Sequence, residues 1–338
     1  MKGWKIIKPY VLEEQAIEEN KENVSVSKVK ITKVLLTLAD VLRYRGDLNC
    51  NNSVLGKIGI GIISETDANL FDLEKGKHTY INPNKACGTC YNCKMGDYDK
   101  CLDMLVAGED YDGFLSDFVA VSTDKLFTLP TSVSDLDALF IEHVALAIAV
   151  FEKLNIQKGD YVCVMGGDNF SIILAQLLIY YQAVPILISD DKENYEIAKK
   201  SGIYYVLGQK DNWQKEVNLI TSGRMTDKIV YVADCDITIS KVLPLIARNG
   251  SMIYTGVSPK ITAFPFAQAI KKQLDILFIN NSEGYTASAI NIIANKVIDF
   301  SHLKLDVSNY EDVCQTLEKM SKNLDEKGKI YETIVNII

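Results

Sequence analysis

Alternation of apolar and polar residues marks the first part of the chain as β-structure. From Val24 to Leu36, apolar side chains recur at nearly every second position, which is typical of a half-buried strand. Shorter runs of the same kind follow at Ile58–Ile63, His78–Ile81 and Phe118–Val121, separated by Gly, Asn and Asp residues. We therefore expect the first ~130 residues to form a small, mostly β barrel or sandwich.

The pattern changes at Ser134. Asp135–Leu154 predicts a helix, and candidate strands and helices then alternate as far as Ile279. The strand candidates include continuous apolar runs such as YVCVM and VPILI, as expected when both faces of a sheet are covered. This alternation predicts an α/β fold with a doubly wound parallel sheet. Its strands are expected at Tyr161–Met165, Val184–Ser189, Tyr204–Leu207, Ile229–Ala233, Ser251–Thr255 and Ile276–Ile279, and its helices at Ser171–Tyr181, Glu193–Ser201, Trp213–Thr221, Ile237–Ala247 and Phe266–Lys272. From Thr286 the chain returns to helices and a final strand at Tyr331–Ile338.

Composition and charge narrow the class of protein. The 338 residues are 48% hydrophobic and 24% charged, which is ordinary for a globular chain of about two domains. A net charge of −8 argues against nucleic acid and anionic membrane surfaces as partners. The longest apolar stretch, Ile172–Tyr181, is far shorter than the ~20 residues of a spanning helix, and the N-terminus lacks the apolar region of a signal peptide. We expect a cytoplasmic protein.

Four of the eight cysteines give the strongest chemical signal. Two residues separate Cys87 from Cys90 and Cys90 from Cys93, and Cys101 follows after seven more. Three such thiolates can wrap one zinc ion, and a fourth can close the tetrahedral shell. The alternative is four reduced, unligated thiols, although clustered cysteines in a reducing compartment more often bind metal. The spacing predicts a structural zinc, because a closed four-thiolate shell leaves no position for chemistry.

This cysteine lobe, with Asn82-Pro83 before it, resembles the structural-zinc lobe of the zinc-dependent alcohol dehydrogenases in the medium-chain dehydrogenase/reductase family. The resemblance runs nearly end to end through Val54-Leu55-Gly56, Phe71 to Gly76, Asp112-Gly113-Phe114 to Phe118-Val119, Ala138-Leu139-Phe140-Ile141-Glu142 and Gln157-Lys158-Gly159-Asp160. It implies a GroES-like catalytic domain at 1–133 and 281–338, with the zinc lobe at 82–103, and a Rossmann dinucleotide-binding domain at 134–280. It also implies NAD(P)-linked oxidation of a small alcohol or reduction of a carbonyl.

The positions that hold the catalytic zinc in this family are changed here. Aligned on Tyr44-Arg45-Gly46-Asp47, Thr37 replaces the first cysteine ligand and Lys57-Ile58 replaces a His-Glu pair, whereas Asp40 and Glu142 are kept. Protonated lysine and isoleucine offer zinc no lone pair, so we expect the catalytic zinc to be absent. The resemblance gives Lys57, Glu142, Thr37 and Asp40 as candidate catalytic residues.

Lys57 is expected to pair with Glu142, because an unpaired buried ammonium is costly. Such a cation could polarise a substrate carbonyl or lend it a proton, and so replace part of the role of the zinc. The alternative is that Lys57 only fills the vacated cavity, with its amine reaching solvent.

The dinucleotide fingerprint is changed as well. Gly166 keeps the first glycine of G-x-G-x-x-G, whereas Asp168 and Ser171 stand at the second and third. A carboxylate at the second position would repel the pyrophosphate, although the loop still follows a strand and opens a helix. Asp190 ends the next strand and could accept the ribose hydroxyls, which would favour NAD over NADP; a helix N-cap role, or Asp191 in its place, are the alternatives. The candidate cofactor-binding residues are Gly166, Gly167, Asn169, Phe170, Asp190, Gly256 and Val257.

Two functions of different classes follow from these features. One is an NAD(P)-dependent oxidoreductase that acts on a small alcohol or carbonyl with one structural zinc per chain. The other is a non-catalytic family member that keeps the fold and the zinc for binding or assembly. The run Asp275–Ile279 resembles the family's last Rossmann strand, which pairs across a dimer interface, so we expect a homodimer or homotetramer.

Overall fold

The computed structural model describes residues 1–17, 25–49, 52–66, 73–208, 210–232, 237–258 and 263–337. The chain divides into two compact units. Unit 1 comprises Met1–Glu142, Thr286–Ala294 and Lys304–Ile338, and unit 2 comprises His143–Tyr285 and Asn295–Leu303. The boundaries of the two functional domains, expected at 133/134 and 280/281, stay a prediction.

Unit 1 is built on a mixed sheet with the strand order β16-β17-β3-β4-β5-β9, and β8 also pairs with β3. Neighbouring strands are antiparallel except β16 and β17, which are parallel. These strands are β3 (Val26–Leu36), β4 (Ile58–Thr66), β5 (His78–Ile81), β8 (Phe118–Ser122), β9 (Leu126–Thr128), β16 (Leu305–Asn309) and β17 (Glu332–Asn336). Two separate pairs are β1 (Lys2–Lys8) with β2 (Val11–Ala16) and β6 (Asn84–Lys85) with β7 (Leu105–Val106).

The alternating run seen in the sequence is strand β3. Val29 and Ile31 point into the core of unit 1 with no exposed surface, and Lys30 between them is exposed. This alternation confirms that one face of the strand is buried, as a period of two requires. Val24, where the expected strand began, lies outside the described residues.

The helices of unit 1 are α1 (Leu38–Arg45), α2 (Tyr91–Lys94), α3 (Asp135–Ala138), α10 (Thr286–Ala294) and α11 (Val313–Lys327). Helix α1 begins with a capping box, in which Thr37 and Asp40 satisfy each other's free backbone N–H groups. It ends at Gly46, whose φ of 82° is left-handed and favours glycine.

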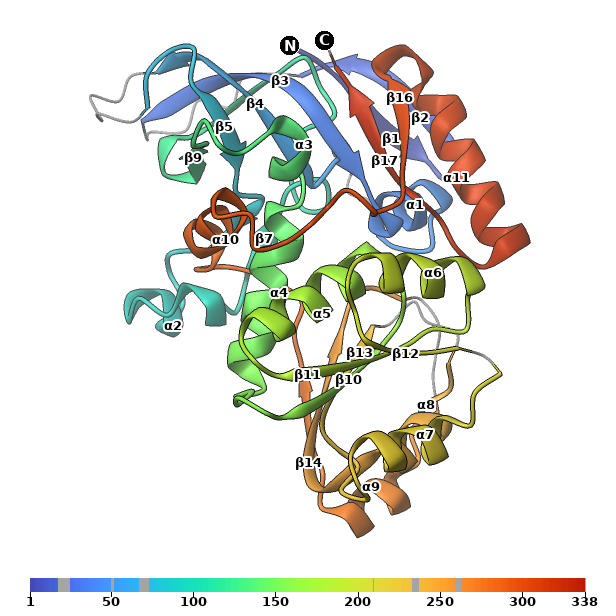
Figure 1. Ribbon diagram of the computed structural model, residues 1–338. Helices are drawn as coiled ribbons and strands as arrows, with labels where there is room; N and C mark the ends of the chain where they lie inside the picture. The colour runs from blue at the N-terminus through green and yellow to red at the C-terminus, as the bar shows by residue number, and fades with distance from the viewer. Residues whose placement is uncertain are drawn as a thin grey trace. The chain divides into compact units, whose positions relative to one another are not determined.

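Unit 2 contains a six-stranded sheet in the order β12-β11-β10-β13-β14-β15, and every pair is parallel. The strands are β10 (Tyr161–Met165), β11 (Val184–Ile188), β12 (Tyr205–Leu207), β13 (Thr226–Val232), β14 (Ile246–Thr255) and β15 (Asp275–Phe278). The helices are α4 (Ile141–Lys153), α5 (Asn169–Tyr180), α6 (Lys192–Lys200), α7 (Trp213–Ile220), α8 (Ile239–Val242) and α9 (Phe266–Lys272), and Figure 1 shows them on both faces of the sheet. The first two residues of α4, Ile141 and Glu142, still belong to unit 1. The predicted α/β class with a doubly wound parallel sheet is confirmed.

Two expected helices differ in the structure. The helix expected at Asp135–Leu154 is divided into α3 and α4, and the residues Leu139, Phe140 and Ile141 at the division are completely buried. Because these residues are apolar in an unbroken run, periodicity could not locate the division.

The helix expected at Ile237–Ala247 is shortened to α8, and β14 already begins at Ile246. Pro244 cannot donate a backbone hydrogen bond and disfavours a helix through it. A short 3-10 turn at Leu243–Leu245 follows α8 in place of a longer α-helix. The carbonyl oxygens of Leu243 and Pro244 accept hydrogen bonds from Lys272 Nζ, at 2.8 and 3.3 Å.

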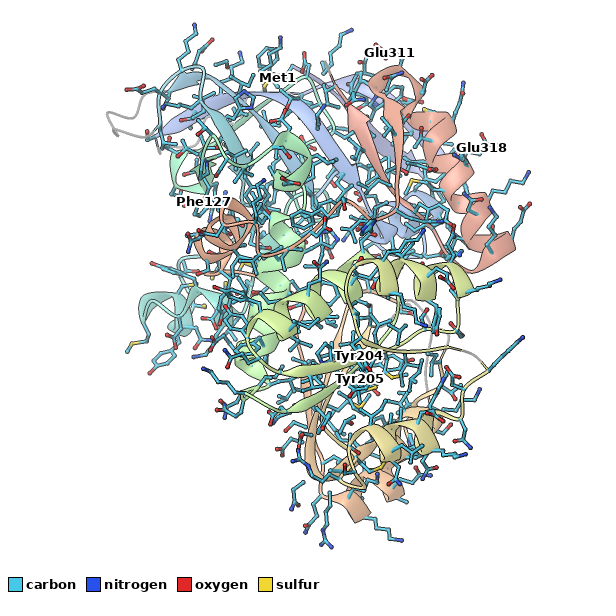
Figure 2. All side chains as sticks on the ribbon, in the orientation of Figure 1. Met1, Phe127, Tyr204, Tyr205, Glu311 and Glu318 are labelled. Atoms are coloured by element: carbon cyan, nitrogen blue, oxygen red, sulfur yellow. The ribbon has the colours of Figure 1, made fainter. Side chains whose placement is uncertain are left out.

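Exposed aromatic rings lie at both edges of the parallel sheet, one just before β12 and one on β15. At one edge, Tyr204 is 83% exposed and packs edge-on against Tyr205 of β12 (Figure 2). At the other edge, Phe278 of β15 is 67% exposed. In the described part of the chain, none of the helices has the length and apolar character needed to cross a membrane.

Candidate functional site

Four cysteine sulfurs of unit 1 lie together in the segment between β6 and β7. The Sγ atoms of Cys87, Cys90, Cys93 and Cys101 all lie within 4.8 Å of one another, and Cys87 Sγ is 3.9 Å from Cys93 Sγ. A tetrahedral zinc with Zn–S bonds of about 2.3 Å places its sulfurs about 3.8 Å apart, so the donor set and its spacing fit this ion. Among the described residues, this is the only group of three or more His, Cys, Asp or Glu side chains placed to hold a metal.

Local backbone geometry prepares these sulfurs for a cation. Cys90 is the N-cap of α2, and its side chain accepts a hydrogen bond from Cys93 N. Hydrogen bonds from the backbone N–H groups of Cys90 and Thr89 lower the pKa of the Cys87 thiol to about 6. Burial raises the pKa of the Cys93 thiol to about 12. Before a cation enters, Cys87 is therefore more readily present as a thiolate than Cys93.

An ion pair between a partly buried lysine and a buried glutamate occupies the positions at which the family resemblance places two catalytic-zinc ligands. Lys57 Nζ lies 2.7 Å from Glu142 Oε1, and the two side chains are 23% and 8% exposed. This contact confirms the predicted pairing of Lys57 with Glu142. The hydroxyl of Tyr80, which is fully buried, donates a hydrogen bond of 3.2 Å to Glu142 Oε2.

Sequence reasoning missed Tyr80. It is the third residue of β5, and its position in the HTYI run predicts only a half-buried strand. No motif marks it, because its partner Glu142 is 62 residues away in the chain.

Asp40 holds the backbone that carries Lys57. Asp40 is fully buried, and its Oδ2 accepts hydrogen bonds from Thr37 N at 2.8 Å and Thr37 Oγ1 at 3.0 Å. Its Oδ1 accepts a hydrogen bond from Gly56 N at 3.1 Å, and Gly56 O accepts one from Phe114 N at 2.8 Å. The structure therefore gives Asp40 and Thr37 a positioning geometry, whereas their catalytic roles stay a prediction.

The loop between β10 and α5 carries the altered glycine fingerprint. Gly166 has a φ of 149°, which favours glycine, and a Cβ there would lie 2.5 Å from Ser171 Oγ. Asp168 is the N-cap of α5, and the first residues of the helix, Asn169 and Phe170, are buried. The loop follows a strand and opens a helix, as a dinucleotide-binding turn does, but a carboxylate stands at its centre.

In the loop between β11 and α6, the two adjacent aspartates considered for a ribose have different roles. Asp191, and not Asp190, is the N-cap of α6, and its Oδ1 accepts hydrogen bonds from Glu193 N at 2.9 Å and Asn194 N at 3.0 Å. The N-cap role considered for Asp190 is therefore wrong. β11 ends at Ile188, so Asp190 does not end this strand as expected but lies two residues beyond it. Its side chain is exposed, and its ribose role stays a prediction.

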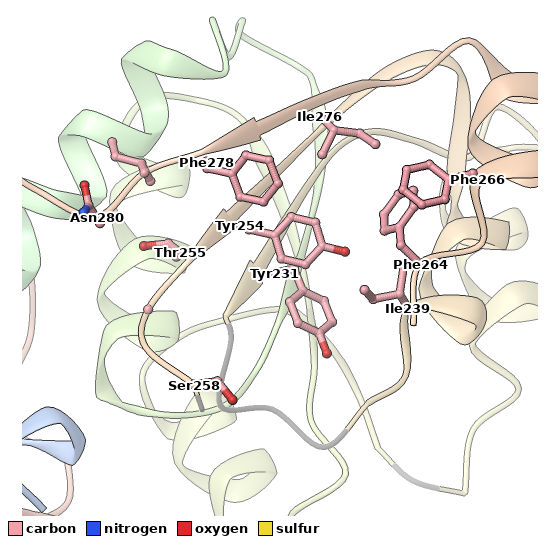
Figure 3. Close-up of a pocket in the computed structure, with 12 residues that line it drawn as sticks. Tyr231, Ile239, Tyr254, Thr255, Ser258, Phe264, Phe266, Ile276, Phe278 and Asn280 are labelled. Carbon is pink, nitrogen blue, oxygen red and sulfur yellow. The ribbon is translucent and has the colours of Figure 1, made fainter. Parts of the chain in front are cut away.

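A cavity of about 820 Å³ opens at the carboxyl ends of β13, β14 and β15 (Figure 3). Tyr231, Tyr254 and Phe278 pair in register across these strands, and their neighbouring ring centroids lie 5.0 and 5.5 Å apart. Figure 3 shows Phe264 and Phe266 facing these rings. The other lining residues are Ile239, Thr255, Gly256, Ser258, Ile276, Ile279 and Asn280. Gly256 belongs to this cavity, whereas Val257 is not among the residues that line it.

Comparisons with known proteins agree with the fold. Residues 25–131 match the model of the alcohol dehydrogenase GroES-like domain. An uncharacterized zinc-type alcohol dehydrogenase-like protein of Haemophilus influenzae is 24% identical over 296 residues, which cover 86% of each chain. D-xylulose reductase A of Aspergillus oryzae is 23% identical over 83% of this chain and 80% of its own.

A solved structure shows the same fold over the whole chain. A short chain alcohol dehydrogenase of Escherichia coli, crystallised with NADH, superposes with a TM-score of 0.86 at 21% identity. The match covers 100% of this chain and 99% of that one.

Proposed function

Because the chain is a zinc-type alcohol dehydrogenase-like protein of the medium-chain dehydrogenase/reductase family, we propose that it is an NAD(P)-dependent oxidoreductase of small alcohols or carbonyls. In this proposal it keeps the structural zinc and works without a catalytic zinc. The observation that carries the proposal is the 2.7 Å contact between Lys57 and Glu142 at the altered zinc positions.

The structural zinc would be held by Cys87, Cys90, Cys93 and Cys101. At the other site, Thr37 and Lys57 replace a thiolate and an imidazole, and Glu142 is engaged by a cation and a phenol. A lone carboxylate cannot provide the three protein ligands of a catalytic zinc.

The cofactor would bind along the carboxyl ends of the parallel strands, as ligands do in open α/β sheets. Gly166, Gly167, Asn169 and Phe170 would meet its pyrophosphate, Asp190 its ribose, and Gly256 and Val257 its nicotinamide end. The exposed carboxylate of Asp190 favours NAD over NADP, because it would repel a 2′-phosphate. When bound, the nicotinamide would supply the hydride acceptor or donor.

Lys57 would take over the electrostatic part of catalysis. An ammonium group has three N–H donors, and its contact with Glu142 engages one of them. A second donor could hold the carbonyl oxygen of a substrate and give it a proton as it becomes an alcohol. Glu142 would keep the ammonium charged and in place, and Tyr80 would hold the second oxygen of Glu142.

The same altered residues support a second candidate function, a non-catalytic family member that uses the fold and the zinc for binding or assembly. The carboxylate of Asp168 in the glycine loop favours this reading. In both cases the exposed edge of β15 supports a homodimer or homotetramer, because a free apolar edge is a site for pairing.

Titration with NADH and NADPH, followed by cofactor fluorescence and by calorimetry, separates the two functions. Saturable binding of either cofactor near one per chain supports the oxidoreductase. Absence of binding of both at millimolar concentration would reject it and leave the non-catalytic function.

A further inference from the structure

The N-terminus of α5 already holds a negative charge from the chain itself. Asp168 Oδ1 accepts a hydrogen bond from Ser171 N at 2.9 Å and a second, short one from Ser171 Oγ. A helix N-terminus attracts anions because its first N–H groups are unpaired and its dipole is positive there. The Asp168 carboxylate provides part of the negative charge that this helix terminus attracts.

The loop before the helix is closely packed around these groups. A Cβ on Gly166 would lie 2.5 Å from Ser171 Oγ, and a Cβ on Gly167 would lie 2.5 Å from Ser189 Oγ. Ser171 stands where the fingerprint has its third glycine, so its hydroxyl both fills space beside Gly166 and binds Asp168. The position of the carboxylate is therefore fixed by its own turn of the helix.

We propose that Asp168 weakens the binding of any dinucleotide by placing a fixed carboxylate in the pyrophosphate-binding turn. This inference rests on the proposed function, because it assumes that the nucleotide enters this turn. A pyrophosphate would meet a like charge and a helix terminus whose positive potential is already partly neutralised. The chain would thus bind its cofactor as a loosely held, readily exchanged ligand.

The Asp168→Asn variant tests this charge. Asparagine is nearly isosteric and is as good an N-cap as aspartate, so the helix should keep its cap. We expect the Kd for NADH to fall at least tenfold, which corresponds to about 1.4 kcal/mol. ADP-ribose, which carries the same pyrophosphate without the nicotinamide, should gain a similar factor in calorimetry. The gain should shrink between about 0.01 M and about 1 M salt, because salt screens exposed charges.

Asp160→Asn is the matched control. Asp160 Oδ2 accepts a hydrogen bond of 2.8 Å from Gln157 N, three residues away, at the amino end of β10. Like Asp168→Asn, the Asp160→Asn variant removes one negative charge from unit 2. We expect its Kd for NADH to stay within twofold of that of the parent protein. Asp168→Ser, another good N-cap, replaces the asparagine variant if that protein does not fold.

The outcomes separate this inference from the proposed function. If the parent binds NADH and both Asp168 variants bind it no more tightly, the inference is wrong and the proposed function stands. If the parent and both variants bind neither NADH nor ADP-ribose, both are rejected. Equal gains in the Asp168 and Asp160 variants would show a general charge effect and would also overturn the inference.

Discussion

The ion pair between Lys57 and Glu142 should contribute measurably to stability, and its strength can be worked from the structure. At 2.7 Å, two unit charges attract by about 6 kcal/mol at an effective dielectric constant of about 20, and by about 1.5 kcal/mol in bulk water. Desolvation of the 8%-exposed Glu142 side chain offsets much of the larger value. Removal of one partner leaves a poorly solvated charge, so we expect Lys57→Met and Glu142→Gln to cost about 2 kcal/mol each.

A double-mutant cycle isolates this contribution. The Lys57→Met, Glu142→Gln double variant should lose about 2 kcal/mol less than the sum of the two single variants, because no unpaired charge remains. Urea unfolding can be followed by the fluorescence of Trp4, which lies in unit 1, in a Trp213→Phe background. This background removes the indole signal of unit 2, so the transition reports on the unit that holds the pair.

The exposed pair of Lys319 and Asp306 is the matched control. Its atoms are 2.9 Å apart in unit 1, but the side chains are 65% and 38% exposed. A cycle on this pair should give less than about 1 kcal/mol. A coupling below about 0.5 kcal/mol for Lys57 and Glu142 would refute the reasoning, because the buried pair would then be no stronger than a surface pair.

Three further predictions address the metal, the chemistry and the assembly. Elemental analysis should find about one zinc per chain, which Cys93→Ser removes; a value near two, with one lost in Glu142→Ala, would contradict a single structural site. Once a substrate is found, Lys57→Met should lower turnover by roughly 10²-fold or more, and an unchanged rate would leave the lysine as a space-filler. Light scattering at micromolar concentration should give a dimer or tetramer that Phe278→Glu weakens; a clean parent monomer would count against pairing through β15.

The features that the sequence predicted well are those set by local spacing. The four cysteines lie within one short segment, so their assembly into one cluster follows from the chain alone. The central parts of the parallel strands were recognisable because runs such as YVCVM in β10 and VPILI in β11 are continuously apolar. β13 and β14 begin earlier than expected, at Thr226 and Ile246, because their first residues include polar and charged side chains. The pairing of Lys57 with Glu142 joins distant segments, and only the alignment of both with zinc-ligand positions predicted it.

The features that the sequence did not predict depend on partners brought together by folding. Tyr80 reaches Glu142 from a strand whose pattern indicates burial and no chemistry. Asp40 was a catalytic candidate, and its hydrogen bond to Gly56 N depends on how the loop before β4 returns to α1. Asp190 and Asp191 are adjacent, so only the start of α6 could decide which of them caps the helix.

The discontinuous make-up of unit 1 has a consequence for synthesis on the ribosome. β17 pairs with the end of β3, with Thr333 opposite Leu36, and β8 pairs with the beginning of β3. The second half of β3 pairs with β4 on one side, but on its other side its neighbour β17 is made about 300 residues later, after nearly all of unit 2. Contacts of such sequence separation form slowly, and a waiting strand edge can pair wrongly. Unit 2 can thus fold while the nascent chain is still being made, and the apolar edge of β3 depends on protection until the last strand is released.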